Sequence, residues 1–323
     1  MNDNFNREWP ETYYPTSSEI EDITVTSLGV AFRNSLPILN TLYRYPYSLI
    51  KGIALAVGSC HKNNPRQIEN LTTPAFVHSQ WSRGYYHWIT ESLPRAVEAV
   101  STYPESVVFI PNSYNSFHPE SLMMLGISFS HFPDHNIKTK RAILTSCPKH
   151  YGTTAAVVLR NLRDMFRERA NTPTDCGRKI YISRSLARGR RVANEDEVED
   201  VLKELGFEIL IPEALSFNDQ VAIFCKADFL ISIHGAGLTN MLFMKENSNV
   251  IELLPFRNGL FDFRPNSFSF KHDNCYLNLS RSMLLKYDYL LCKHDRKFYQ
   301  KTNLSNIYVD CEKLQAIVKR QLD

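Results

Sequence analysis

The chain has 323 residues, and its 37 lysines and arginines nearly balance 34 aspartates and glutamates, which leaves a formal net charge of +3. That balance argues against a protein that binds nucleic acid or coats a membrane through bulk charge, so any anion site must be local. Hydrophobic residues make up 43% and aromatic residues 12%, as in a globular protein with substantial cores. The length suits two domains of about 150 residues each.

The seven cysteines include no CxxC pair, and an odd number cannot all pair within one chain. This pattern favours reduced thiols over a disulfide framework or a zinc site. The first residues lack the basic start and apolar run of a secretory signal. No apolar run approaches the ~20 residues of a membrane span. We therefore expect a cytoplasmic protein that could associate with the inner face of a membrane.

Strand and helix patterns alternate clearly only from residue 106 onward. Residues 1 to 22 read as a polar lead-in, and the next forty carry no clear pattern. Strands are predicted at 106–111, 141–146, 179–185, 207–212, 228–234 and 250–255. Helices are predicted at 119–126, 154–169, 194–206, 217–227, 236–244 and from 310 to the end. The alternation predicts an α/β fold with largely parallel sheets.

The polar stretch ANTPTDCG (170–177) has the composition of a linker. We place the domain boundary there, which gives an N-terminal domain of residues 1–172 and a C-terminal domain of residues 173–323, both Rossmann-like. Asn194 is predicted to cap the helix that follows it, and Asp310 to cap the last helix. The last helix is amphipathic and could pack back on the N-terminal domain.

The segment YYHWITESLPR (85–95) places three polar side chains four residues apart. On a helix, His87, Glu91 and Arg95 would share one face. Pro94 complicates this row, because a proline that deep in a helix kinks or ends it. The row is either a solvated polar stripe or a site.

The segment SIHGAGLTN (232–240) leads an apolar strand through a turn poor in side chains into a predicted helix. Backbone N–H groups in such a turn can approach a ligand closely, and the helix start favours an anion such as a diphosphate. His234 ends the strand, where ligands of open α/β sheets bind. The alternative is that the glycines merely permit a tight turn and that His234 is an interior histidine.

In YISRSLARGRR (181–191), Arg184 follows a strand, and the planar fork of arginine matches phosphate oxygens. We interpret Arg190 and Arg191 as a solvated basic loop. Glu252 is a single carboxylate in the apolar run VIELLP, where it would bind a ribose or form a structural ion pair. The sequence has no GxGxxG fingerprint, no P-loop and no DxD pair. The diphosphate site is therefore predicted to need no metal.

Together, YYHWITESLPR, YISRSLARGRRVANEDEV, DFLISIHGAGLTNMLFM and VIELLP resemble glycosyltransferase family 61 over roughly residues 75–255. The resemblance implies a GT-B architecture, in which two Rossmann-like domains face each other across a cleft. It also implies inversion at the anomeric carbon, a nucleotide-sugar donor linked to UDP, and no obligatory divalent metal or other cofactor. The lack of an anchor or signal fits a bacterial enzyme that adds a sugar to a glycan or lipid-linked glycan during capsule-type polysaccharide biosynthesis.

Roles follow for the residues in these motifs. Either His87 or Glu91 would be the catalytic base, and we favour His87 with Glu91 orienting it. The predicted donor-binding residues are Ser183, Arg184, Arg188, His234, Gly235, Ala236, Gly237, Leu238, Thr239, Asn240 and Glu252. The predicted acceptor-binding or supporting residues are Arg83, Tyr85 and Arg95. The alternative function is an inactive glycosyltransferase-like subunit that scaffolds a polysaccharide-assembly complex.

Overall fold

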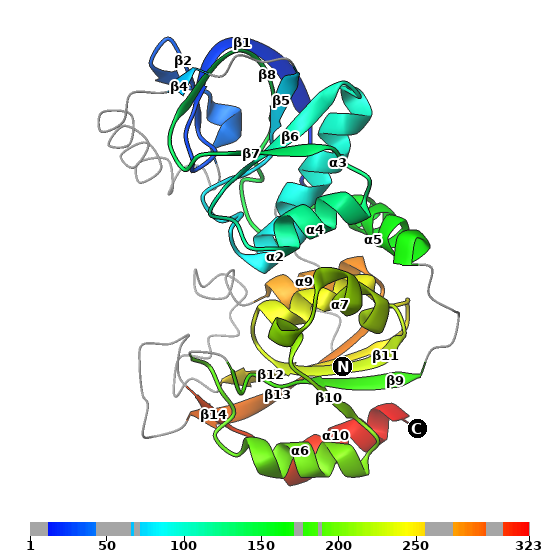
Figure 1. The fold of residues 1–323 in the computed structure, drawn as a ribbon. Helices are drawn as coiled ribbons and strands as arrows, with labels where there is room; N and C mark the ends of the chain where they lie inside the picture. The colour runs from blue at the N-terminus through cyan, green and yellow to red at the C-terminus, as the bar shows by residue number, and fades with distance from the viewer. Residues whose placement is uncertain are drawn as a thin grey trace. The chain divides into compact units, whose positions relative to one another are not determined.

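The structure is a computed structural model. It describes residues 12–42, 66–67, 72–170, 177–186, 189–255, 274–294 and 306–322. The chain divides into two compact units, Met1–Leu162 and Arg163–Asp323. The predicted boundary between residues 172 and 173 lies outside the described residues. Each unit carries a β-sheet and helices, which confirms the predicted α/β class (Figure 1).

The sheet of the N-terminal unit is mixed rather than largely parallel as predicted. Its strands are β1 (Ser17–Val25), β2 (Ala31–Arg33), β3 (Leu36–Pro37), β4 (Arg66–Gln67), β5 (Thr73–Phe76), β6 (Ser106–Pro111), β7 (Phe129–Phe132) and β8 (Ile137–Thr145). They are ordered β3-β2-β1-β8-β5-β6-β7, with β4 beside β8. From β8 to β7 neighbours run parallel, whereas β1, β2 and β3 form an antiparallel extension that joins β8.

Strand β1 shows that the polar lead-in predicted for residues 1 to 22 is wrong from Ser17 onward. This strand pairs along its length with β8. Ile23 and Val25 enter the core of the unit, whereas Glu19 forms an ion pair with Arg141 on β8 at the surface. An antiparallel strand with one solvated face reads as polar in sequence, which is why composition concealed it.

The helices of this unit are α2 (Tyr85–His87), α3 (Leu93–Thr102), α4 (Phe117–Met124) and the start of α5 (Ala156–Ala170), with a 3₁₀ turn η1 (Leu39–Thr41). Helix α3 contacts β1, β6 and β8. In the core, the ring of Phe76 packs edge to face against those of Phe109 and Phe132. The predicted strand at 106–111 and the helices at 119–126 and 154–169 are confirmed within two residues at most ends.

Gly29 is a point where the turn after β1 crosses the chain that leaves β5. Its φ is +78°, and a methyl group at this position would overlap the carbonyl group of His78. We expect Gly29→Ala to lower the free energy of unfolding by more than about 3 kcal/mol, because backbone strain and a backbone overlap add. Gly206→Ala is the matched control, because its φ is +80° and its nearest neighbour is a lysine Nζ at 3.6 Å. Similar losses for both variants in urea unfolding would contradict the prediction.

The C-terminal unit is built on a doubly wound sheet. Its strands are β9 (Arg178–Ile182), β10 (Glu208–Leu210), β11 (Ala227–Ile233), β12 (Asn249–Pro255), β13 (Lys286–His294) and β14 (Ile307–Tyr308). They are ordered β10-β9-β11-β12-β13-β14, and all pairs are parallel except the last. In chain order the parallel strands read 2-1-3-4-5. The order therefore reverses between β9 and β11, the place where such sheets bind ligands.

Helices cover both faces of this sheet. Helices α6 (Glu195–Glu204) and α10 (Cys311–Leu322) lie on one face; α7 (Phe217–Phe224), α9 (Cys275–Ser282) and the 3₁₀ helix η4 (Ala236–Phe243) lie on the other (Figure 1). A 3₁₀ turn, η3 (Pro212–Ala214), follows β10. Every strand predicted in this half is present, and β13, β14 and α9 were not predicted. In the described parts of the chain, no helix combines the length and apolarity that a membrane crossing requires.

The last helix closes the core of its own unit. Leu314 and Val318 of α10 join the same buried cluster as residues of α6 and the sheet. Asp310 accepts the backbone N–H three residues on at 3.1 Å, as predicted for its cap. Asn194 does not cap α6: its side chain exchanges two 2.9 Å hydrogen bonds with the backbone of Val309. A tertiary partner thus replaces the predicted local cap.

Candidate functional site

The YYHWITESLPR segment is not one regular helix. Helix α2 passes into a π-helical turn, Trp88–Ser92, in which the Leu93 N–H bonds the carbonyl five residues back, before α3 begins. Pro94 has no N–H, so it cannot occupy the carbonyl of Thr90 as a helix residue would. The Thr154 hydroxyl donates to that carbonyl instead, at 2.8 Å. Such turns are frequent at functional sites.

Thr154 therefore satisfies a buried backbone group that the proline leaves without a helical partner. We expect Thr154→Val to lower the free energy of unfolding by about 1–2 kcal/mol, because the Thr90 carbonyl would stay buried with nothing to accept from. Thr154→Ser keeps the hydroxyl and should retain most of the stability. The comparison is made by urea unfolding, and equal stability of the valine and serine variants would contradict this role.

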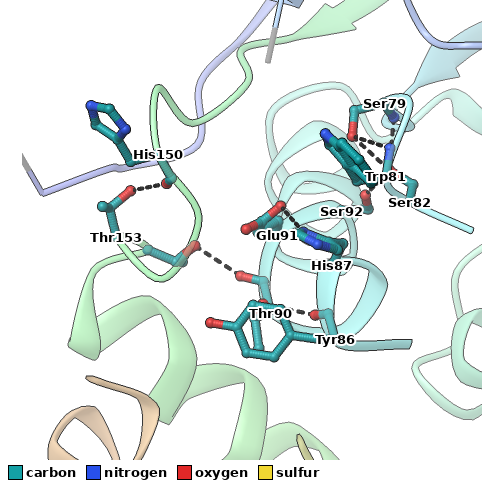
Figure 2. Close-up of polar contacts among 11 residues, drawn as sticks. Ser79, Trp81, Ser82, Tyr86, His87, Thr90, Glu91, Ser92, His150 and Thr153 are labelled. Carbon is teal, nitrogen blue, oxygen red and sulfur yellow. Dashed lines mark hydrogen bonds and ion pairs between the residues drawn. The ribbon is translucent and has the colours of Figure 1, made fainter. Parts of the chain in front are cut away.

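His87 and Glu91 come together on the π turn, as the spacing predicted. His87 Nδ1 lies 3.0 Å from Glu91 Oε2 (Figure 2). The His87 side chain is 22% exposed and the Glu91 side chain 3%. With Nδ1–H donating to the carboxylate, the imidazole carries its lone pair on Nε2. The exposed member of the pair is thus the one suited to contact a ligand, and the buried member is suited to orient it.

Arg95 does not extend the row. Its Nε donates to Thr145 Oγ1 at 2.9 Å and its Nη2 to Thr145 O at 3.2 Å, and the side chain is buried. The extra residue in the π turn rotates later positions by about 100° relative to a continuous helix. Among the other predicted acceptor-side residues, Tyr85 packs edge-on against Phe117 and Arg83 is exposed.

The His87–Glu91 pair lies in the segment that follows β5, and β5 is a parallel neighbour of β8. These parallel strands are neighbours although they are far apart in sequence, so strand order reverses between them. The π turn follows β5, and Tyr151, after β8, lies with its ring centroid 6.0 Å from that of His87. Open α/β sheets bind ligands at such positions.

In the C-terminal unit, the segments after β9 and β11 meet at the corresponding reversal of strand order. Arg184 lies so close over Gly235 that a methyl group there would overlap its Nη1. Its Nε is buried with no hydrogen-bond partner, and among the described residues it forms no ion pair. Burial, and then the nearby Arg190, lower the pKa of Arg184. A half-buried cation without a carboxylate suits an anionic ligand.

Arg190 also belongs to this cluster, although we interpreted it from the sequence as part of a solvated loop. Its Nη1 donates to the backbone carbonyl of His234 at 3.1 Å. The sequence signal for this role was the run Gly189-Arg190-Arg191, which follows the Ser183–Arg184 pair closely. Sequence alone could not show that the loop folds back over β11.

Glu252 is wholly buried beneath His234. One carboxylate oxygen is paired with His234 Nδ1, and the other accepts from the Tyr287 hydroxyl on β13. Burial, followed by the charge of Glu252, raises the pKa of Tyr287, so the phenol stays protonated and donates. Of the two roles left open for Glu252, these contacts are those of a structural pair. The sequence held no signal for Tyr287.

The glycine turn is only partly exposed, since Gly235 is buried, Ala236 exposed and Gly237 half-buried. The segment after Gly235 is the 3₁₀ helix η4 instead of the predicted α-helix; its residues 238–243 are all buried, so packing overrides local preference there. Of the predicted donor contacts, Ser183, Leu238, Thr239 and Asn240 are buried, whereas His234, Ala236 and Gly237 reach the surface. Arg188 lies outside the described residues. Among the described side chains, no three His, Cys, Asp or Glu gather as around a metal ion.

These features define a class: an α/β protein with two arginines clustered at the reversal of strand order in a doubly wound sheet and a separate histidine–carboxylate pair. The chain belongs to the glycosyltransferase 61 family, whose family model matches residues 85–251, just over half of the chain. The match begins at Tyr85, two residues before His87, and ends beside Glu252.

Curated relatives share shorter stretches. A rice (Oryza sativa subsp. japonica) β-1,2-xylosyltransferase is 34% identical over 122 residues, covering 35% of this chain and 21% of that protein. A rice α-1,3-arabinosyltransferase is 34% identical over 73 residues, 21% of this chain and 12% of that protein. The mouse (Mus musculus) EGF domain-specific O-linked N-acetylglucosamine transferase is 30% identical over 114 residues, 34% of this chain and 19% of that protein. The matches thus span about a fifth or less of these relatives.

Proposed function

We propose that this protein is a glycosyltransferase that moves a sugar from a UDP-linked donor to a hydroxyl of a glycan, with inversion and without a metal. The observation that carries the proposal is the His87–Glu91 pair, held 3.0 Å apart at a ligand-binding position within the segment that matches the family model. A partly exposed histidine backed by a buried carboxylate is the arrangement of a general base.

His87 is the proposed base. In an inverting transfer, the acceptor hydroxyl attacks the anomeric carbon from the face opposite the leaving diphosphate, and Nε2 of His87 takes its proton. Glu91 holds Nδ1–H, fixes the tautomer and stabilises the imidazolium that forms. Its burial prevents it from reaching the acceptor as readily as His87 does, which favours this assignment over the reverse.

The proposed donor site is the cluster around Gly235. As the sugar leaves, negative charge develops on the diphosphate, and Arg184 and Arg190 would meet it together with backbone N–H groups of the glycine turn. Arginine forks and amides can neutralise this charge without a divalent ion. The Tyr287–Glu252 contacts would hold His234 at the edge of the same site.

The GT-B architecture is part of the proposal, since transfer needs the donor carbon and the acceptor oxygen at one place. A glycan or lipid-linked glycan acceptor in capsule-type polysaccharide biosynthesis is also proposed. The named relatives transfer xylose, arabinose or N-acetylglucosamine, so these are the donor sugars to test first. Because these relatives transfer different sugars, the sugar that this protein transfers has to be identified by experiment.

The test is a screen of the full chain against UDP-xylose, UDP-arabinose, UDP-N-acetylglucosamine, UDP-glucose and UDP-galactose. A bound donor should raise the melting temperature by mass action. Transfer to a glycan panel is then followed by NMR, where an α-linked donor should give a β-linked product. Donor binding without transfer to any acceptor would favour the non-catalytic scaffold instead. Absence of both binding and transfer would remove the proposal.

A further inference from the structure

Trp81 presents a large aromatic surface to solvent beside the His87–Glu91 pair. Its side chain belongs to the loop between β5 and α2 and is 47% exposed. A single exposed aromatic residue is ordinary on a protein surface and carries no argument alone. What Trp81 can bind depends on how its turn is held in place and on the position of its ring beside His87.

The turn that carries Trp81 is held by buried hydroxyl groups. Ser82 Oγ accepts from the Ser79 N–H at 2.7 Å and lies 2.6 Å from Ser92 Oγ at the end of the π turn (Figure 2). The Ser82 N–H donates to Ser79 O at 3.0 Å, and the Gly84 N–H donates to Trp81 O at 2.9 Å. The turn is thus bonded to the π turn that directly follows His87. A fixed aromatic surface loses little entropy when it binds a ligand.

The indole lies next to the proposed base. The ring centroids of Trp81 and His87 are 5.9 Å apart, with 31° between the ring planes. A ligand stacked on the indole therefore has its edge within reach of the imidazole. The ring of Tyr151 lies 6.0 Å from His87 and nearly perpendicular to it.

We propose that Trp81 is the stacking platform for the pyranose ring of the acceptor, a role that rests on the proposed function. The axial C–H bonds of a pyranose form an apolar face with slight positive charge, which is attracted to the negative face of an indole. Hydroxyls at the ring edge would then point toward His87. A nucleobase fits less well, because the phosphates attached to it would be brought toward the negative charge of Glu91.

The proposal is tested by fluorine NMR on the full chain labelled with 5-fluorotryptophan, which has three signals, from Trp9, Trp81 and Trp88. Trp81→Phe assigns the Trp81 signal. Titration with methyl β-pyranosides of xylose, glucose, galactose and N-acetylglucosamine should shift that signal saturably, with a Kd in the millimolar range for at least one of them. No shift with any of these sugars, or a shift with uridine or UDP instead, would overturn the proposal.

Kinetics give a second readout. With an acceptor that carries the glycoside found to bind, Trp81→Ala should raise the acceptor KM by about tenfold and leave the donor KM unchanged. Met123→Ala is the matched control, because Met123 is 59% exposed on α4, and it should change neither constant. An unchanged acceptor KM in Trp81→Ala counts against the platform. If sugars shift the Trp81 signal but no nucleotide sugar supports transfer, the proposed function fails while the sugar site stands.

Discussion

Replacing His87 by alanine is expected to lower kcat by about 10²–10⁴-fold, the range that a lost general base produces. The structure makes His87 the exposed member of its pair and leaves Glu91 buried behind it. The acceptor proton then has no side chain to receive it, while the donor cluster in the other unit is untouched. Affinity for UDP, measured by calorimetry, should therefore change by less than about twofold.

Glu91→Gln distinguishes the two assignments of the base. If Glu91 orients His87, this variant should lose less activity than His87→Ala, and the double variant should resemble His87→Ala alone, since residues that act as a unit are not additive. If Glu91 were the base, Glu91→Gln would show the larger loss and His87→Asn would retain activity. His131→Ala is the control for removing a histidine, because His131 is exposed on β7. Near-normal transfer by both His87→Ala and Glu91→Gln would end the catalytic role of the π turn.

Arg184→Ala should weaken UDP binding by about 10–100-fold, because a charge-assisted hydrogen bond to phosphate contributes about 1.5–3 kcal/mol. In the folded protein the Nε of this side chain has no hydrogen-bond partner and its Nη2 donates to a backbone carbonyl, that of Gly189, so these contacts leave the charge of Arg184 unneutralised. Calorimetry with UDP is the measurement. Unchanged affinity would take Arg184 out of the donor site.

Two further variants sharpen that experiment. Arg178→Ala removes an arginine from β9, the strand that precedes Arg184. Arg178 pairs with Glu208 at the surface, so UDP affinity should stay within about twofold. Gly235→Ala leaves Arg184 in the chain but places a methyl group where its Nη1 lies. It should therefore weaken UDP binding in the same direction as Arg184→Ala. Full affinity in Gly235→Ala would show that the observed placement of Arg184 is not the one that binds.

The parts of the fold that the sequence predicted are those whose pattern is local. Buried parallel strands read as apolar runs, so the strand at 228–234 and its neighbours were found. Strand β1 was missed because its solvated face carries acidic residues, and the cap expected at Asn194 was displaced by a partner more than a hundred residues away. The interpretation of η4 as an α-helix failed because burial of residues 238–243, and not periodicity, decides its conformation.

The sequence by itself determined the α/β class, the spacing that pairs His87 with Glu91, and the two strand ends that carry Arg184 and Gly235, because each depends on residues close together in the chain. Only the tertiary structure decided that Arg95 turns away to Thr145, that Glu252 is paired with His234 and Tyr287, and that Arg190 lies at the turn after β11. Those contacts join elements that are far apart in the sequence. They depend on sheet order and on a π turn whose Thr90 carbonyl accepts from Thr154, just before α5. No local sequence pattern records either feature.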